Sequence, residues 1–265
     1  MKTATRIPVL MYHRVGTVNN SWEARYAIRP ADFAAHMETL ARKGYRAVTA
    51  DALVEWLKGG PPLPFGAFVL TFDDGFRGVR EHALPVLEKL GWPFTVFLVS
   101  DLIGATDIWT LAENPAGVTY PLLDEDEIRD MLQRNVSFHS HTRSHADLPT
   151  LDDALLADQL AGPRHTLSKL VGHDVPYIAY PFGHLDERVE AATRATGYRA
   201  AFSTQPGFNR QDVNPFRIRR LDVFGTDSPA MLLRKIKLGT NDGSLAHAAR
   251  YYLDRLKSRL MGTKQ

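Results

Sequence analysis

Stretches with the composition of buried strands alternate with stretches of helical periodicity about seven times along this chain of 265 residues. Alternation with short connections is typical of parallel strands joined by helices that cover the sheet. So many units favour closure of the sheet into a barrel, and an open doubly wound sheet is the alternative. Because we find neither a linker nor an internal repeat, we predict a single α/β domain over residues 1–265.

The predicted strands are short apolar runs, and they cover residues 7–13, 45–48, 68–72, 94–99, 136–141, 177–180, 199–202 and 216–221. The predicted helices have apolar residues three or four apart, and they cover residues 32–43, 52–57, 81–90, 125–132, 152–171, 188–196, 228–237 and 244–260. Residues 101–122 have no period, and we expect them to form a long functional loop. The C-terminal segment 240–265 is predicted to be a basic helix.

The composition narrows the chemistry that the chain can perform. The 32 Lys and Arg residues nearly balance the 30 Asp and Glu residues, so the overall charge does not favour a nucleic-acid partner. Because the chain has no cysteine, any metal has to be held by His, Asp or Glu. No apolar run reaches the roughly 18 residues of a membrane span. The polar residues 1–6 do not read as a signal peptide, so we expect a cytoplasmic protein.

Two adjacent carboxylates, Asp73 and Asp74, end the apolar strand 68–72 and are followed by Gly75. In α/β proteins, ligands gather at the tips of parallel strands. Neighbouring carboxylates repel each other, and a bound cation or a shared proton makes the pair tolerable. An ordinary turn in which an aspartate caps the next helix is the alternative interpretation.

A second strand tip carries His141 and His145, four residues apart. On a helical turn the two imidazoles would lie on one face and hold one metal ion. Strand tips of one barrel point into the same mouth, so these histidines and one aspartate would supply the three protein ligands of an open catalytic zinc site. The other aspartate is then free to act as a base.

Residues 71–75, Thr-Phe-Asp-Asp-Gly, and residues 141–145, His-Thr-Arg-Ser-His, together resemble two motifs of the polysaccharide deacetylase family, the NodB homology domain of carbohydrate esterase family 4. The resemblance covers roughly residues 7–225. It implies a distorted (β/α)7 barrel and hydrolytic removal of acetyl groups from an N-acetylated sugar or glycan. It also implies a divalent metal, most often Zn²⁺, with Ni²⁺, Co²⁺ or Fe²⁺ as alternatives. By position, Asp73 resembles the catalytic base of the family, and Asp74, His141 and His145 resemble its three metal ligands.

Residues 179–183, Ala-Tyr-Pro-Phe-Gly, resemble a third family motif, in which the N–H of the aromatic residue after proline helps to hold the oxyanion. The resemblance makes Phe182 this donor, with Pro181 and Tyr180 beside the substrate. The family has an arginine where this chain has Ala179, so the partner that orients the base has to come from elsewhere. The candidates are Arg77, Arg217, Arg219 and Arg220.

The general acid of the family is a histidine on a late strand, and His247 is a poor match because it lies in a predicted helix. His13 matches better, at the tip of strand 7–13, as in the circularly permuted branch related to poly-N-acetylglucosamine deacetylases. Moving one strand from the end of a closed barrel to its beginning preserves the site, so we expect His13 to be the acid. Aromatic residues that could stack on a sugar ring are Trp109, Tyr120, Tyr12 and Tyr180.

Two other functions stay open from the sequence. His139 and His141 occupy alternate strand positions and would point to one side, as in two-metal barrels of the amidohydrolase or phosphoesterase kind. A non-catalytic carbohydrate-binding barrel with a structural metal is the second alternative, because the motif arginine is replaced and the family's fourth motif, an Asp-Trp pair, is not visible. The sequence does not specify the sugar, the acyl group or the oligomeric state.

Overall fold

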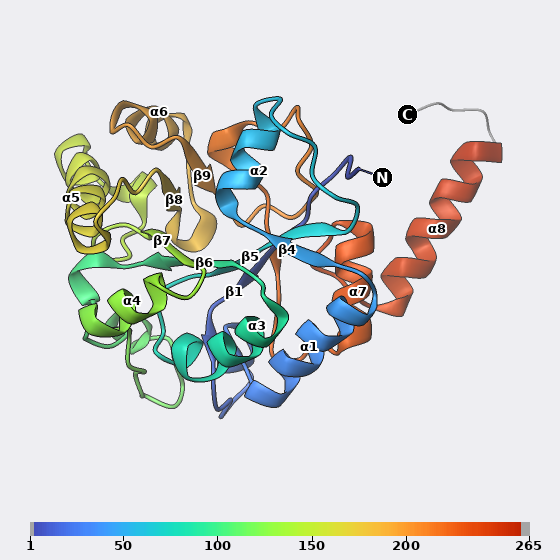
Figure 1. The fold of residues 1–265 in the computed structure, drawn as a ribbon, viewed down its shortest axis with the longest axis horizontal. Coiled ribbons are helices and arrows are strands. Elements are labelled where there is room, and N and C mark those ends of the chain that lie inside the picture. Colours follow the sequence, from blue (N-terminus) through green and yellow to red (C-terminus); the bar gives the residue numbers. More distant parts are fainter. Residues whose placement is uncertain (1–2, 261–265) are drawn as a thin grey trace.

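The computed structural model describes residues 3–260, and within them eight parallel strands form one curved sheet that helices cover on the outside (Figure 1). The strands of this sheet are β1 (Val9–Tyr12), β4 (Arg46–Val48), β5 (Ala67–Phe72), β6 (Phe94–Leu98), β7 (Val136–Ser140), β8 (Tyr177–Ala179), β9 (Ala200–Phe202) and β10 (Leu221–Asp222). The helices are α1 (Pro30–Arg42), α2 (Ala50–Leu57), α3 (Leu84–Leu90), α4 (Glu125–Leu132), α5 (Asp153–Val171), α6 (Glu187–Ala195), α7 (Pro229–Leu238) and α8 (Leu245–Leu260). The predicted strand 216–221 is reduced to β10, because Pro215–Arg217 forms a 3₁₀ turn.

The strands follow the order β10-β1-β5-β6-β7-β8-β9, and β4 pairs with the beginning of β5. One short segment, residues 218–222, connects the two ends of this order. Ile218 pairs with Phe202 of β9, and Leu221 of β10 pairs with Leu10 of β1. Residues 218–222 therefore bring the sheet round into a ring, and the predicted (β/α)7-type barrel is confirmed.

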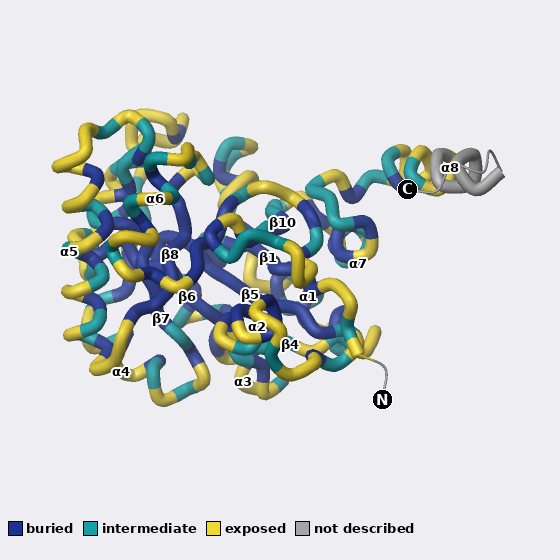
Figure 2. Tube along the Cα trace, turned by 90° about the horizontal axis from the view of Figure 1, so that it is seen from above, coloured by how far each residue is buried: buried dark blue, intermediate teal, exposed yellow. Residues whose placement is uncertain are grey.

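Burial explains why these segments become strands. Every residue of β1, β5 and β6 is buried, because one face packs inside the barrel and the other packs under helices. Figure 2 shows the buried residues concentrated along the strands and the exposed residues along the helices and loops. Polar caps start the covering helices: Asp124 forms a capping box with Glu127 at α4, and Asp152 accepts the Leu155 N–H at α5.

A second, two-stranded sheet follows β1 directly, with β2 (Arg14–Val15) paired to β3 (Ala27–Ile28). The segment between these strands contains the 3₁₀ helix Glu23–Arg25. Gly78 packs against β2 and Gly225 against β3 so closely that a Cβ on either would lie 2.1 Å from a backbone oxygen of that strand. These backbone contacts fix the small sheet against the barrel, beside the tip of β1.

Helix α8 projects away from the barrel (Figure 1). It corresponds to the predicted basic C-terminal helix, and residues 261–265 lie outside the described residues. Leu245, Tyr252 and Leu253 are exposed on it. Among residues 3–260, no helix combines the length and the apolar character that a membrane span requires.

Leu221 tests the closure of the ring, because its side chain is fully buried where β10 meets β1. Leu221→Ala should lower the free energy of unfolding by about 2–5 kcal/mol, the usual cost of a cavity at a buried leucine. Leu155→Ala is the matched control, since Leu155 is 53% exposed on α5, and it should change that free energy by less than about 0.5 kcal/mol. Urea denaturation measures both variants, and equal losses would contradict the placement of Leu221 in the core.

Candidate active site

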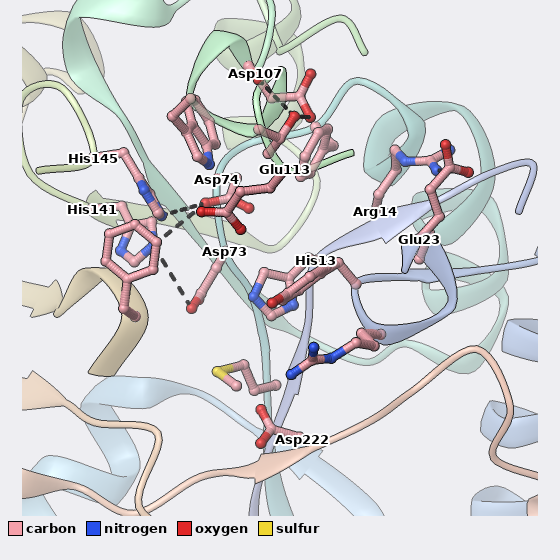
Figure 3. A pocket seen from close by; sticks show the side chains of 18 of the residues that line it. His13, Arg14, Glu23, Asp73, Asp74, Asp107, Glu113, His141, His145 and Asp222 are labelled. Carbon is pink, nitrogen blue, oxygen red and sulfur yellow. Dashed lines mark hydrogen bonds and ion pairs between the residues drawn. The ribbon is translucent and has the colours of Figure 1, made fainter. Parts of the chain in front are cut away.

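The C-terminal tips of the barrel strands surround a cavity of about 370 Å³ (Figure 3). His13 follows β1, Asp73 and Asp74 follow β5, and His141 and His145 follow β7; all five line the cavity. The shared edge of the parallel sheet thus brings together the residues that the sequence singled out. The other predicted site residues that line the cavity are Trp109, Tyr120, Tyr180 and Phe182.

Asp73 and Asp74 are both almost completely buried at the tip of β5. The Asp73 N–H donates to the Tyr12 carbonyl, so Asp73 continues the strand, whereas Asp74 has a left-handed backbone with φ of 72°. Gly75 also has a positive φ, 81°, and a Cβ there would lie 2.6 Å from Leu98 Cδ2. The glycine permits a sharp turn, and each carboxylate meets a different partner.

Asp73 forms a bidentate salt bridge with Arg220. Arg220 Nη1 and Nη2 donate to Asp73 Oδ1 and Oδ2 at 2.6 and 2.8 Å, and the guanidinium is completely buried. The Nε of Arg220 donates to the Ser203 carbonyl at 2.9 Å, which fixes the plane of the guanidinium. Burial alone would raise the pKa of Asp73, but Arg220 and then His141 outweigh burial and lower that pKa to about 2. Asp73 is therefore an ionised, oriented carboxylate at neutral pH.

Arg220 lies in the segment that closes the barrel, and it is the one of the four candidate arginines that contacts Asp73. Arg77 pairs instead with Glu127 at 3.0 Å, and Arg217 pairs with Glu190 at 2.6 Å. The replacement of the motif arginine by Ala179 does not leave Asp73 without a counter-ion, because a guanidinium reaches it from beside β1.

Asp74, His141 and His145 form a cluster whose ligand atoms lie within 4.8 Å of one another. Asp74 Oδ1 is 3.4 Å from the Nε2 atom of each histidine. His141 Nδ1 donates to the Ala179 carbonyl at 2.8 Å, which leaves a lone pair on its Nε2 for a metal ion. Figure 3 shows the three side chains converging.

The charge of Asp74 fits a bound cation. Its Oδ1 is buried and has no hydrogen-bond partner in the described part of the chain. Burial raises the pKa of Asp74 well above its usual range, and the carboxylates of Asp73 and Asp107 add to that rise. A divalent ion relieves both the desolvation and the repulsion, and two imidazoles with one carboxylate suit such an ion. The residues present therefore fit a divalent metal.

The helical turn predicted for residues 141–145 is wrong. Thr142 and His145 have left-handed backbones, with φ of 68° and 61°, so the chain reverses after β7 and α5 begins only at Asp153. The His145 N–H donates to Thr142 Oγ1 at 3.2 Å, which stabilises the reversal. The two imidazoles meet because of this loop, with ring centroids 5.0 Å apart, and helical spacing plays no part.

His13 lies across the acid pair from His141 and His145 (Figure 3). Burial lowers the pKa of His13 to about 4, whereas the Asp73 carboxylate raises it and Arg220 lowers it. His247 lies on α8, 3.6 Å from Asp242, and does not line the cavity. The strand-tip position of His13 thus brings it into the cavity.

The turn after β8 lines another part of the cavity. Phe182 is 48% exposed and has a left-handed backbone with φ of 58°, while Pro181 is buried beneath it. Gly183 permits this turn, because its φ is 73° and a Cβ would lie 1.8 Å from Thr204 Oγ1. The ring of Tyr180 is fully buried, so the expected stacking face is not there. Tyr12 is likewise buried, and its hydroxyl bonds to His36.

Trp109 has the position that the sequence suggested, on the long loop 101–122 and half-buried at the cavity. Its ring stacks on His145, with centroids 4.6 Å apart and planes 14° apart. Phe182 contacts the same imidazole edge-on, at 4.7 Å. Trp109 and Phe182 therefore form an aromatic wall around one member of the metal cluster.

His139 does not join the cluster. It is buried against Phe97 and Tyr177, and neither of its ring nitrogens has a hydrogen-bond partner in the described residues. Among residues that the structure describes, the group able to hold a metal consists of Asp74, His141 and His145. This arrangement does not support a two-metal site built on His139 and His141.

Sequence reasoning missed a buried carboxylate at the rim of the cavity. Glu23 is 1% exposed and accepts hydrogen bonds from Arg14 Nη2 at 3.1 Å, Tyr120 Oη at 2.7 Å and Asn114 Nδ2 at 3.3 Å. Glu23 lies in a loop without periodicity, so no pattern marked it as buried. Its partners come from β2 and from the loop 101–122, and it ties these two segments together.

Comparison with known proteins agrees with this geometry. The family model described as polysaccharide deacetylase matches residues 61–201. The chain is 26% identical to YxkH of Bacillus subtilis over 226 residues, which are 85% of this chain and 73% of that protein. It is 23% identical to the poly-beta-1,6-N-acetyl-D-glucosamine N-deacetylase of Staphylococcus epidermidis over 237 residues, across 81% and 78% of the two chains. The solved structure of the Streptococcus pyogenes deacetylase PplD shares the fold, with a TM-score of 0.75 and 20% identity over 89% of this chain and 99% of that one.

The cluster predicts one divalent ion per chain, held through Asp74, His141 and His145. His145→Ala removes one of three ligands, so metal content after dialysis should fall well below one ion per chain by elemental mass spectrometry. His139→Ala is the control, since His139 is a buried histidine outside the cluster, and it should keep the ion. Full occupancy in His145→Ala would contradict the ligand assignment, and loss only in His139→Ala would favour the pair His139 and His141.

Proposed function

This chain belongs to the polysaccharide deacetylase family, and we propose that it is a metal-dependent hydrolase that removes N-acetyl groups from a sugar chain. The observation that carries the proposal is that the two adjacent aspartates have different partners. Asp73 is held ionised by Arg220, while Asp74 joins two histidines in a cluster that fits a cation. A hydrolase that attacks an unactivated amide needs both a base and an electrophile in one cavity.

We infer that the ion is zinc, because two histidines and one carboxylate leave coordination positions open, as catalytic zinc sites do. When bound, such an ion supplies Lewis acidity that polarises an amide carbonyl and makes a water molecule more acidic. The chain's own contribution is to hold Asp74 Oδ1 and two imidazole nitrogens toward one point, with the His141 ring oriented by the Ala179 carbonyl.

Asp73 is the proposed general base. Its low pKa keeps it ionised at neutral pH, as a base has to be before it accepts a proton from water, and Arg220 fixes the direction in which its oxygens point. The backbone N–H of Phe182 is the proposed donor to the oxygen that becomes negative during attack. The left-handed turn at Phe182 supports this role, because a strained backbone at a cavity wall has to be maintained by its surroundings.

His13 is the proposed general acid, which delivers a proton to the leaving nitrogen. Burial lowers its pKa to about 4, so only a small fraction of His13 carries the proton at pH 7, and that fraction falls further as the pH rises. The Asp73 carboxylate is the group that favours the imidazolium form of His13. Base and acid thus act on opposite sides of one amide, and the charge on one stabilises the other.

The function is tested by measuring acetate release and mass loss from N-acetylglucosamine oligomers, including the β-1,6-linked tetramer, with zinc-loaded protein. Asp73→Asn is the matched variant, because it keeps the shape of the side chain and loses the base. It should retain the metal and lower kcat by about a hundredfold or more. Wild-type protein that holds zinc, binds these sugars and releases no acetate would favour a non-catalytic carbohydrate-binding barrel. Undiminished turnover by Asp73→Asn would place the base elsewhere.

His13→Ala should lower kcat by about 10²–10⁴ and leave the metal content unchanged. An acid works only while it is protonated, so the wild-type rate should fall as the pH rises through the pKa of His13 in the working protein. This basic limb of the pH–rate profile should vanish in His13→Ala. His247→Ala is the control, because His247 lies outside the cavity, and it should change kcat little. The opposite pattern in the two variants would rule out His13 as the acid.

A further inference from the structure

A second aromatic wall of the cavity has no part in the chemistry described so far. Trp22 and Tyr26 line the cavity, with ring centroids 5.1 Å apart, and the Tyr26 ring contacts His13 edge-on at 5.6 Å. We refer to Trp22 and Tyr26 as the aromatic shelf. Tyr26 is 37% exposed, and Trp22 is half-buried. Neither residue belongs to a cluster of the hydrophobic core, so packing does not account for them.

The polar ends of the aromatic shelf are free. Within the described residues, neither the Trp22 indole N–H nor the Tyr26 hydroxyl forms a hydrogen bond with the protein. A pyranose ring presents an apolar C–H face together with hydroxyl groups at its edge. Aromatic residues with an unpaired donor suit both features, because the ring packs on the face and the donor meets a hydroxyl.

A buried cluster of hydrogen bonds around Glu23, which we call the clamp, links the segment of the aromatic shelf to the loop that forms the opposite wall. Glu23, which lies between the two shelf residues in the sequence, accepts hydrogen bonds from Arg14, Asn114 and Tyr120. The Arg14 guanidinium also lies 3.5 Å from the centre of the Tyr120 ring. Asn114 and Tyr120 belong to the loop that carries Trp109. The clamp therefore joins the segment of the shelf to the segment of the opposite aromatic wall.

The reacting groups lie between the two walls. Figure 3 shows His141 and His145 on one side of Asp73 and Asp74, and His13 with Glu23 on the other side. Trp109 and Phe182 surround His145, while Tyr26 and then Trp22 extend outward from His13. A sugar ring beside His13 would lie next to Tyr26, and a second ring farther out would lie next to Trp22.

We propose that the aromatic shelf is a sugar subsite, in which Trp22 binds the sugar next to the one that carries the acetyl group. The inference rests on the proposed function, in which His13 faces the nitrogen of the amide. The ring attached to that nitrogen extends toward Tyr26, and the neighbouring ring of the chain packs on Trp22. Trp22 thus contributes only to substrates of two or more sugars, whereas Tyr26 contributes to all of them.

The test compares kcat/KM for N-acetylglucosamine and for its β-1,4- and β-1,6-linked tetramers, with zinc-loaded protein. The wild type should prefer at least one tetramer to the single sugar. Trp22→Ala should lower kcat/KM for that tetramer by about three- to tenfold, the scale of one aromatic contact, and should lower it less for the single sugar. Trp22→Phe should restore most of the preference, because it keeps an aromatic face.

Phe65→Ala is the matched control, since Phe65 is an aromatic residue that is 70% exposed and outside the cavity, and it should keep the wild-type preference. Equal losses of kcat/KM for the single sugar and the tetramer in Trp22→Ala would overturn the proposal. The melting temperature of each variant separates a loss of folding from a loss of binding.

A binding measurement separates this proposal from the proposed function. Calorimetric titration of zinc-loaded Asp73→Asn with either tetramer reports affinity without turnover, and adding Trp22→Ala should weaken that affinity by a similar factor. Trp22-dependent binding without turnover by the wild type would support the subsite and contradict the proposed deacetylation. Turnover by the wild type, with a preference for the tetramer that Trp22→Ala leaves unchanged, would support the proposed deacetylation and contradict the subsite. If neither tetramer binds, the subsite is excluded.

Discussion

Two carboxylates that are adjacent in the sequence lie buried side by side at the tip of one strand, and the surrounding barrel has to compensate both of them. Neither could stay charged there alone, because burial and mutual repulsion each favour the protonated form. The positive charge of Arg220 compensates Asp73 directly. Asp74 instead faces two imidazoles, which carry no positive charge in their neutral form. One carboxylate is thus kept ionised by the protein itself, and the other is left to a cation. Opposite environments give neighbouring identical side chains different chemistry.

Most of the non-glycine residues with an unfavourable, left-handed backbone conformation belong to the same site. Among the described residues, the non-glycine positions with left-handed φ are Asp74, Asn135, Thr142, His145 and Phe182, and all except Asn135 belong to the site. Each such residue costs about 1 kcal/mol or more, so the site is maintained at the expense of the barrel around it. The turns that carry this strain aim the ligands and the cavity wall, which regular strand or helix geometry would point elsewhere.

The barrel and most of the candidate site could be predicted, because strand periodicity and strand-tip motifs are local patterns. The sequence could not show which of four arginines pairs with Asp73, since the answer depends on where the ring of strands closes. The turn at residues 141–145 was misjudged because the spacing of two histidines says nothing about left-handed backbone between them. Tyr180 follows a buried strand, and only the packing of α5 and α6 decides that its ring points inward. Trp22 and Tyr26 lie in an aperiodic loop, and their meaning comes from the cavity that they line.

The ring is closed by strands from opposite ends of the chain, since β1 pairs with β10. Contacts between residues so distant in sequence form late and slowly, after the local strand–helix units. During synthesis, the segments that carry Asp73, His141 and His145 leave the ribosome well before the segment that carries Arg220. A nascent chain therefore contains Asp74, His141 and His145 while Asp73 still lacks the guanidinium that compensates its charge. Formation of the buried pair between Asp73 and Arg220 is therefore coupled to completion of the barrel.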